Sequence, residues 1–226
     1  LDGWGISPDP SVSAVAQAQT PFMDSLSKNA VHNVLHTDGM HVGLPEGQMG
    51  NSEVGHVNLG AGRVVYQDLA KINMAVEQNT LKDEAVLKDA FAYAKANNKA
   101  VHFLGLVSDG GVHAHVNHIE GLLKAAHEAQ VPKSYIHAFT DGRDVDPKSG
   151  LGFLTKVQEM CASTNAHLAS VVGRYFAMDR DQRWERVKKA YDLLVSGTGT
   201  QTENLAQAMQ ANYDAGTTDE FIEPIV

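Results

Sequence analysis

The chain has 226 residues, of which 43% are hydrophobic and 20% charged, and its formal net charge is −9 at pH 7. These values are typical of a globular protein with a substantial core, and the acidic balance argues against nucleic-acid binding. No apolar run is long enough to span a bilayer and no basic-then-apolar leader is present, so we expect no membrane partner and a cytoplasmic location. The one cysteine, Cys161, stands in a helical-looking segment and is interpreted as a core residue rather than a nucleophile.

Residues 1–66 consist of short segments between glycine-rich turns, and a strand is expected over 31–36. The chain opens on Leu1-Asp2-Gly3 without the hydrophobic strand that usually precedes a functional Asp-Gly in open α/β folds. Residues 221–226 read as a strand at the other end, so we expect a fragment cut at both ends. The helix-like residues 67–80 are expected to link this part to the rest.

From residue 81 onward, helical and strand patterns alternate. Apolar residues recur at helical spacing over 82–97 and are followed by an apolar run over 100–107. Further helices are expected near 115–130, 149–162 and 183–195, and further strands near 135–139 and 167–172. This succession predicts an α/β fold with a mostly parallel sheet flanked by helices.

Polar clusters follow each of these strands, at 108–111, 140–144 and 173–174, and should line one edge of the sheet. Five of the six arginines lie between residues 143 and 186, and arginine suits a bidentate grip on phosphate or carboxylate. A site for a small anion is therefore predicted. Arg143 would be a clamp and Asp144 a base that takes a hydroxyl proton, although a turn with a surface ion pair is an alternative.

Part of the charge pattern after residue 174 has a helical explanation. The pairs Asp179/Arg183 and Glu185/Lys189 have the spacing of i,i+4 ion pairs on a helix. Arg174 and Arg180 are not explained in this way and remain candidates for the anion site.

Residues 47–56 surround one hydroxyl, that of Ser52, with glycines and with carboxylate, amide and imidazole neighbours. The pattern predicts a nucleophilic or metal-bound serine that accepts phosphate, and the alternative is Ser52 as a helix N-cap. It matches neither G-x-S-x-G nor the nucleotide P-loop. Asp2 and Ser52 could share a hard divalent cation, whereas Asp2 could also simply cap its Asp-Gly turn.

The histidines at 113, 115 and 118 have a spacing that suggests transition-metal ligands. No cysteine or carboxylate within 110–118 completes a tetrahedral set. Hydrogen bonds to a phosphate from the start of a helix, or simple solvation, are the alternatives.

Together these segments closely resemble the cofactor-independent (2,3-bisphosphoglycerate-independent) phosphoglycerate mutases of the alkaline phosphatase superfamily. The resemblance covers essentially all of this chain but only about the first half of a family member. It is carried by the motifs at 1–5, 50–56, 108–113, 140–144 and 173–181.

The resemblance implies a two-domain isomerase that interconverts 3-phosphoglycerate and 2-phosphoglycerate in glycolysis and gluconeogenesis without bisphosphoglycerate. Residues 1–66 would be an incomplete part of an alkaline-phosphatase-like, metal-binding α/β domain. Residues 67–80 would be the linker helix, and 81–226 an incomplete substrate-binding phosphotransferase domain. A monomer is expected, with a small-molecule phosphoglycerate as its partner.

The resemblance also implies roles for individual residues. Ser52 would be the phosphoserine nucleophile, and Asp2 and Ser52 would ligate one of two manganese ions. Asp144 would handle proton transfer at the substrate hydroxyl that accepts the phosphoryl group. The remaining manganese ligands would follow Val226, so the 226-residue chain alone is expected to have little or no activity. The residues expected to hold substrate are His113, Arg143, Asp144, Arg174 and Arg180.

Two other functions remain open at this point. One is a phosphatase or phosphopentomutase of the same superfamily, which would share the metal and nucleophile but differ in the clamp. The other is a non-catalytic anion-binding module, for which the arginines alone would suffice.

Overall fold

A computed structural model of the chain describes residues 3–226, so the roles expected of Asp2 lie outside the described residues. Backbone contacts divide the chain into two compact units, Leu1–Gln67 and Asp68–Val226, and each is described by itself. No helix in the described part is long and apolar enough to cross a membrane.

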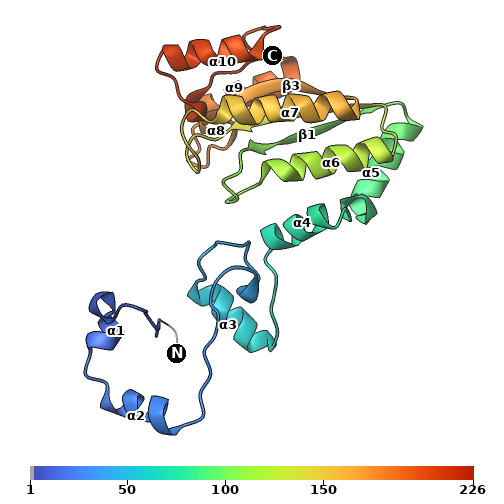
Figure 1. Cartoon of the computed structure of the whole chain (residues 1–226). Coiled ribbons are helices and arrows are strands. Elements are labelled where there is room, and N and C mark those ends of the chain that lie inside the picture. The colour runs from blue at the N-terminus through green and yellow to red at the C-terminus, as the bar shows by residue number, and fades with distance from the viewer. Residues whose placement is uncertain (1–2) are drawn as a thin grey trace. The chain divides into compact units, whose positions relative to one another are not determined.

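The first unit contains short helices joined by irregular chain (Figure 1). The strand expected over 31–36 is wrong, because these residues are irregular. A strand needs a hydrogen-bonding partner, and within residues 3–67 the structure contains only one isolated bridge, Asp38 to Met49. The helices are η1 (Pro10–Val12), α1 (Ala14–Gln17), α2 (Pro21–Asn29), η2 (Gly39–Val42) and α3 (Ser52–Ala61).

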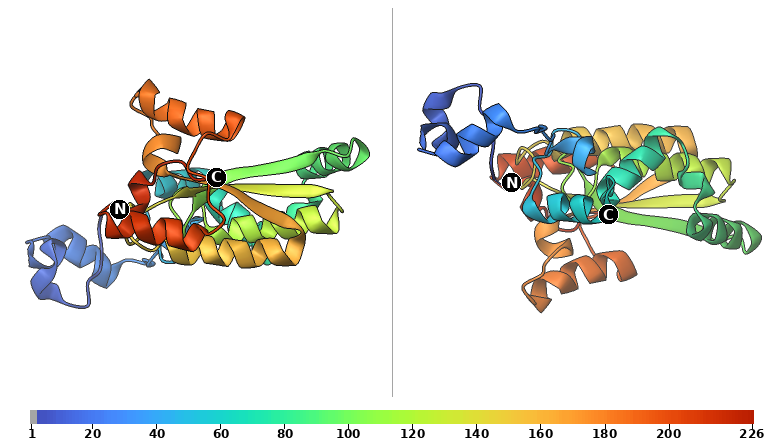
Figure 2. Two further views of the ribbon diagram at one scale, coloured as in Figure 1. Left: turned by 90° about the horizontal axis from the view of Figure 1, so that it is seen from above. Right: turned by 90° about the horizontal axis from the view of Figure 1, so that it is seen from below.

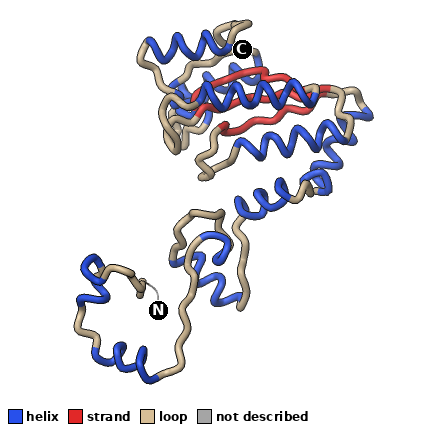
Figure 3. The backbone as a smooth tube through the Cα atoms, in the orientation of Figure 1, coloured by secondary structure: helices blue, strands red, loops and turns tan. Residues whose placement is uncertain are grey.

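The second unit is α/β, as predicted, and holds the strands drawn red in Figure 3. The helix expected at 67–80 is α4 (Asp68–Glu77), which contacts α6 within this unit. The other elements are η3 (Leu81–Asp83), α5 (Ala85–Ala96), β1 (Ala100–Val107), α6 (Val116–Glu128), β2 (Lys133–Thr140), α7 (Gly150–Thr164), β3 (Ala166–Gly173), α8 (Arg174–Ala177), α9 (Trp184–Ser196), α10 (Leu205–Asp214) and η4 (Asp219–Phe221).

The sheet is parallel, with the strand order β1-β2-β3. Because both crossovers advance in the same direction, right-handed connections place α6 and α7 on the same face, as Figure 2 shows. Val107 is paired with Thr140, and Thr140 with Gly173. The carboxyl ends of all three strands therefore meet at one edge, as the polar clusters predicted.

The main core lies between the sheet and these two helices. Leu123 of α6 and Leu154 and Val157 of α7 pack against the strands there, together with Cys161. Cys161 is 5% exposed and burial raises the pKa of its thiol to about 11, so its interpretation as a core residue is confirmed.

The other face of the sheet carries a smaller cluster. Val172 packs there with Phe176 of α8 and Leu193 of α9, whereas its neighbour Val171 belongs to the main core. This division follows from the alternation of side chains along a strand.

The strand expected over 221–226 is wrong as a regular element. Its first part is the end of η4, and Ile225 forms isolated bridges with Val171 and Thr200. The amide of Gly173 also donates to the carbonyl of Ile222 at 2.7 Å. The final residues therefore run along the outer side of β3 without pairing continuously.

Candidate substrate site at the sheet edge

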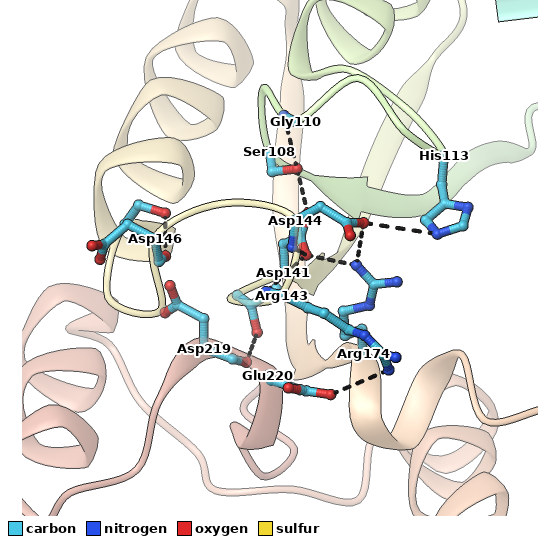
Figure 4. Close-up of polar contacts among 12 residues, drawn as sticks. Ser108, Gly110, His113, Asp141, Arg143, Asp144, Asp146, Arg174, Asp219 and Glu220 are labelled. Atoms are coloured by element: carbon cyan, nitrogen blue, oxygen red, sulfur yellow. Dashed lines mark hydrogen bonds and ion pairs between the residues drawn. The ribbon is translucent and has the colours of Figure 1, made fainter. Parts of the chain in front are cut away.

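Side chains from all three strand ends meet at the carboxyl edge of the sheet (Figure 4). Ser108 follows β1, Asp141 and Asp144 follow β2, and Arg174 follows β3. The Ser108 hydroxyl donates to Asp141 Oδ2 at 2.6 Å, and Arg174 Nη1 donates to Asp141 Oδ1 at 2.6 Å. Three loops that are distant in the sequence thus share one polar cluster.

Asp141 lies at the centre of this cluster and is 2% exposed. Besides the two side chains, the backbone amides of Arg143 and Asp144 donate to Asp141 Oδ1 at 3.2 and 3.0 Å. Burial by itself would raise the pKa of Asp141, but these donors stabilise the carboxylate and the net effect lowers the pKa. The buried charge is therefore retained at neutral pH.

Arg174 joins this buried carboxylate to a second one. Its Nη1 also donates to Asp144 Oδ2 at 2.7 Å, and its side chain is 9% exposed. Burial opposes the charge of Arg174, yet its hydrogen bonds to Asp144 and Asp141 raise its pKa above the ordinary value. His113 Nε2 lies 3.8 Å from the same Asp144 oxygen. The structure therefore brings His113, Asp144 and Arg174 together.

The side chains of Arg143 and Arg180 do not join this group. The Arg143 side chain is 62% exposed, and its Nη1 lies 3.8 Å from Glu220 Oε1. Arg180 is exposed and follows α8, and within residues 3–226 its guanidinium forms no hydrogen bond or ion pair. Both remain accessible to a solute.

The helical ion pairs expected after residue 174 are wrong. Asp179 precedes α9, where it accepts the backbone amide of Arg183 at 2.9 Å and pairs with Arg186 at 3.4 Å. Lys189 pairs instead with Glu223 at 2.6 Å, because the end of the chain passes beside α9. The sequence has the i,i+4 spacing, but in the structure Asp179 and Lys189 form ion pairs with residues at other spacings.

Ser52 is the first residue of α3, and Asn51 is its N-cap through a 2.9 Å bond from the Val54 amide. The alternative of Ser52 as the N-cap is therefore wrong. Ser52 Oγ lies 3.2 Å from His56 Nδ1, which also lies 2.7 Å from the Ser52 carbonyl oxygen. Because a carbonyl can only accept, Nδ1 carries the proton, and His56 is not oriented to take the hydroxyl proton.

The remaining histidines of the 113–118 segment stabilise the start of α6. His115 Nδ1 accepts the amide of Asn117, and His118 Nε2 lies 2.6 Å from Asn73 Oδ1. Burial and the nearby His115 lower the pKa of His118. In residues 3–226, no group of three or more His, Cys, Asp or Glu side chains could hold a metal ion. In the structure His115 and His118 bond to groups of the protein itself, which neither the phosphate-binding nor the solvated alternative anticipated.

Sequence reasoning placed Ser108 and Asp141 in the strand-end clusters but did not single them out as site residues. The available signal was an aspartate directly after an apolar strand and directly before Gly142. An acceptor at that position can collect the amides of the turn that follows it. Asp141 is thus the residue that connects all three loops.

Residues 72–226 match the protein family described as BPG-independent PGAM N-terminus (iPGM_N). The chain belongs to this family. The match covers nearly all of the second unit, including the sheet-edge cluster, and it confirms the resemblance found in the motifs. The iPGM_N family description itself supports independence from bisphosphoglycerate.

Curated relatives extend the similarity through the first unit. A protein of Flavobacterium johnsoniae named 2,3-bisphosphoglycerate-independent phosphoglycerate mutase is 62% identical over 226 residues, covering 100% of this chain and 45% of its own length. A protein of the same name from Caenorhabditis elegans is 49% identical over 231 residues, covering 100% of this chain and 42% of its own length. The chain thus spans less than half the length of these iPGM relatives.

A solved structure shows the same fold. The crystal structure of a Leishmania mexicana phosphoglycerate mutase, determined at low cobalt concentration, superimposes with a TM-score of 0.72 at 32% sequence identity. The alignment covers 100% of this chain and 43% of that protein.

Proposed function

We propose that a polypeptide of the relatives' full length containing this chain is a 2,3-bisphosphoglycerate-independent phosphoglycerate mutase. It would interconvert 3-phosphoglycerate and 2-phosphoglycerate in glycolysis and gluconeogenesis, as a monomer in the cytoplasm. The names of the relatives support the mutase assignment. The observation that carries it is the meeting of His113, Asp144 and Arg174 at the edge where parallel sheets bind ligands.

The substrate carries a phosphate and a carboxylate, and the proposed site offers cations for both. Arg174 is held in one orientation by two carboxylates, so its remaining N–H groups present a fixed fork to an anion. Arg143 follows β2 and Arg180 follows α8, and both are exposed; they would add further cationic groups for the substrate anions. Holding the glycerate at several points keeps it bound between the two transfers and limits attack by water.

Asp144 is the proposed acceptor of the hydroxyl proton. Arg174 and His113 both face its Oδ2, and its side chain is 21% exposed. The second oxygen is not used by these contacts and can receive a proton from a glycerate hydroxyl. Arg174 would stabilise the carboxylate between proton transfers.

Ser52 is the proposed carrier of the phosphoryl group. In the first transfer a bond forms between Ser52 Oγ and phosphorus, and the ester bond to the 3-oxygen of the glycerate breaks. The proton of the Ser52 hydroxyl passes to the freed 3-oxygen, and the glycerate turns while the arginines hold it. In the return transfer the 2-hydroxyl gives its proton to Asp144 and receives the phosphoryl group, while the bond between Ser52 Oγ and phosphorus breaks. Ser52 Oγ then regains the proton that Asp144 releases. The exposed position of Ser52 at the N-terminus of α3 would suit this role, since helix N-termini stabilise phosphate.

Two manganese ions are the proposed cofactor of the whole protein, with Asp2 and Ser52 as the ligands contributed by this chain. The described residues do not fit a complete metal centre, since residues 3–226 contain no suitable group of three ligands. Asp2 lies outside the described residues. We therefore derive no step of the reaction through the metal.

The test uses 3-phosphoglycerate with a labelled phosphate and a full-length polypeptide that contains this chain. We expect labelled 2-phosphoglycerate to form without free phosphate, and the Ser52→Ala variant to bind substrate but transfer nothing. Release of phosphate instead of the isomer would identify a phosphatase. Full turnover by Ser52→Ala would refute the phosphoserine mechanism. The 226-residue chain alone is expected to show little or no turnover.

A further inference from the structure

The loop over residues 141–149 carries Arg143 and Asp144, and both of its ends are tied to one distant residue, Asp219 of η4. The Thr140 hydroxyl, just before the loop, donates to the Asp219 carbonyl oxygen at 2.7 Å. The amide of Gly150, just after the loop, donates to Asp219 Oδ2 at 2.7 Å.

A third contact reaches the loop itself, because the Asp219 amide donates to the Pro147 carbonyl at 2.9 Å. Asp219 is completely buried, and the Tyr213 hydroxyl donates to its second carboxyl oxygen, Oδ1. Burial raises the pKa of Asp219, and Tyr213 and Gly150 oppose that shift by stabilising the carboxylate. Every polar atom of Asp219 thus has a partner, and most of these partners frame the loop.

Glycines at both ends of the loop also approach Asp219 closely. A Cβ added at Gly150 would lie 2.5 Å from Asp219 Oδ1, and one added at Gly142 would lie 2.9 Å from Asp219 Cβ. Gly142 has a φ of +64°, a conformation that favours glycine. Both glycines therefore allow the backbone of the loop to approach Asp219 more closely than any other residue type would.

We propose that Asp219 is a positioning residue that fixes the loop over 141–149 and thereby the placement of Arg143 and Asp144. The next residue, Glu220, lies 3.8 Å from the Arg143 guanidinium, so η4 also contacts the exposed side chain of Arg143. The consequence for substrate rests on the proposed function, because it requires this loop to grip a phosphoglycerate.

The test compares Asp219→Asn with the control Val157→Ala. Asparagine keeps the size of the side chain but has one acceptor oxygen, so it cannot accept from Gly150 and from Tyr213 at the same time, as the carboxylate does. Val157 is completely buried in the same core, two turns along α7 from Gly150, and its truncation destabilises the unit without touching the loop. Measurements are made at a temperature where circular dichroism shows all variants folded.

The first readout is the set of backbone amide NMR shifts for residues 141–149 in the ligand-free 226-residue chain. We expect these shifts to change in Asp219→Asn and to stay near wild type in Val157→Ala. Unchanged loop shifts in Asp219→Asn would overturn the positioning role. This readout does not depend on any activity.

The second readout is the KM for 3-phosphoglycerate of the full-length polypeptide. We expect KM to rise about tenfold or more in Asp219→Asn while kcat changes less, because small displacements of gripping groups are costly. Val157→Ala should leave KM unchanged. If the loop shifts change but the wild-type protein does not isomerise phosphoglycerate, the proposed function fails and the positioning role stands. An unchanged KM in an active Asp219→Asn would overturn the link to substrate.

Discussion

Replacing Asp141 by asparagine should weaken the second unit substantially, because one buried charge holds three loops together. The carboxylate of Asp141 accepts from Ser108, from Arg174 and from two backbone amides. Asparagine keeps one acceptor oxygen but loses the charge that balances Arg174.

The expected cost follows from these contacts. Breaking a buried ion pair outright costs about 3–5 kcal/mol, but here Asp144 remains as a partner of Arg174. A hydrogen bond to a charged group is worth about 1.5–3 kcal/mol, so we expect a loss of about 2–3 kcal/mol at pH 7. For a unit of this size that corresponds to a fall in Tm of roughly 4–12 °C.

The pH dependence gives a second check of the same reasoning. The pKa of Asp141 is lowered in the folded chain, so its contribution is fully present above the unfolded value of about 3.9. The contribution is lost as the pH falls through the folded pKa. The difference between wild type and Asp141→Asn should therefore be the same at pH 5 and pH 7 and should shrink in more acidic solution.

Urea unfolding followed by far-UV circular dichroism measures these differences. The matched control is Asp109→Asn, which makes the same chemical change at an exposed position on the same edge of the sheet. The control should change the free energy of unfolding by less than about 0.5 kcal/mol. An Asp141→Asn effect as small as the control, or one that persists undiminished in acid, would refute the buried-charge argument.

Further predictions concern single contacts. Gly150→Ala should lower the Tm of the chain, because the added methyl group would meet the Asp219 carboxylate. Gly152→Ala, whose added Cβ would meet nothing within 4 Å, should instead stabilise α7 by about 0.5–1 kcal/mol. Equal Tm values for the two variants would contradict this reasoning. The Cys161 thiol, with a pKa raised to about 11, should resist alkylation at pH 8 until urea unfolds the chain, and rapid labelling of folded protein would be inconsistent with its burial. The pKa of His118 is lowered, so its ring should titrate below the ordinary histidine value of about 6.5 in NMR spectra, and stability should fall as the pH drops below about 6.5; a titration midpoint at or above the ordinary value would count against this.

The alternating part of the fold was predictable because its signals are local. The apolar run over 100–107 became β1 with the same bounds, and α6, β2, α7, β3 and α9 lie within a few residues of their expected ranges, whereas α8 and α10 were not anticipated. The shared sheet edge followed from a rule about parallel strands rather than from any contact. The segment over 31–36 failed because β-rich composition does not provide a partner strand.

Much of the site was not predictable from residue patterns. Asp219 meets Gly150 and Thr140 across 69 and 79 residues of sequence, and nothing local to Asp219 indicates such partners. The replacement of Asp179/Arg183 by Asp179/Arg186 likewise depends on where α9 begins. Asp141 was within reach of sequence reasoning, because a turn acceptor directly after a strand is a recognisable pattern.

The pairing of each strand with its predecessor bears on how the nascent chain can fold during translation. Ala100 pairs with Lys133 and Ser134 with Ala166, so each strand finds its partner about one βαβ unit back. The sheet can therefore be assembled strand by strand as the ribosome extends the chain. Asp219 emerges from the ribosome only after all three strands. The loop over 141–149 can therefore be fixed in position only after the sheet has formed.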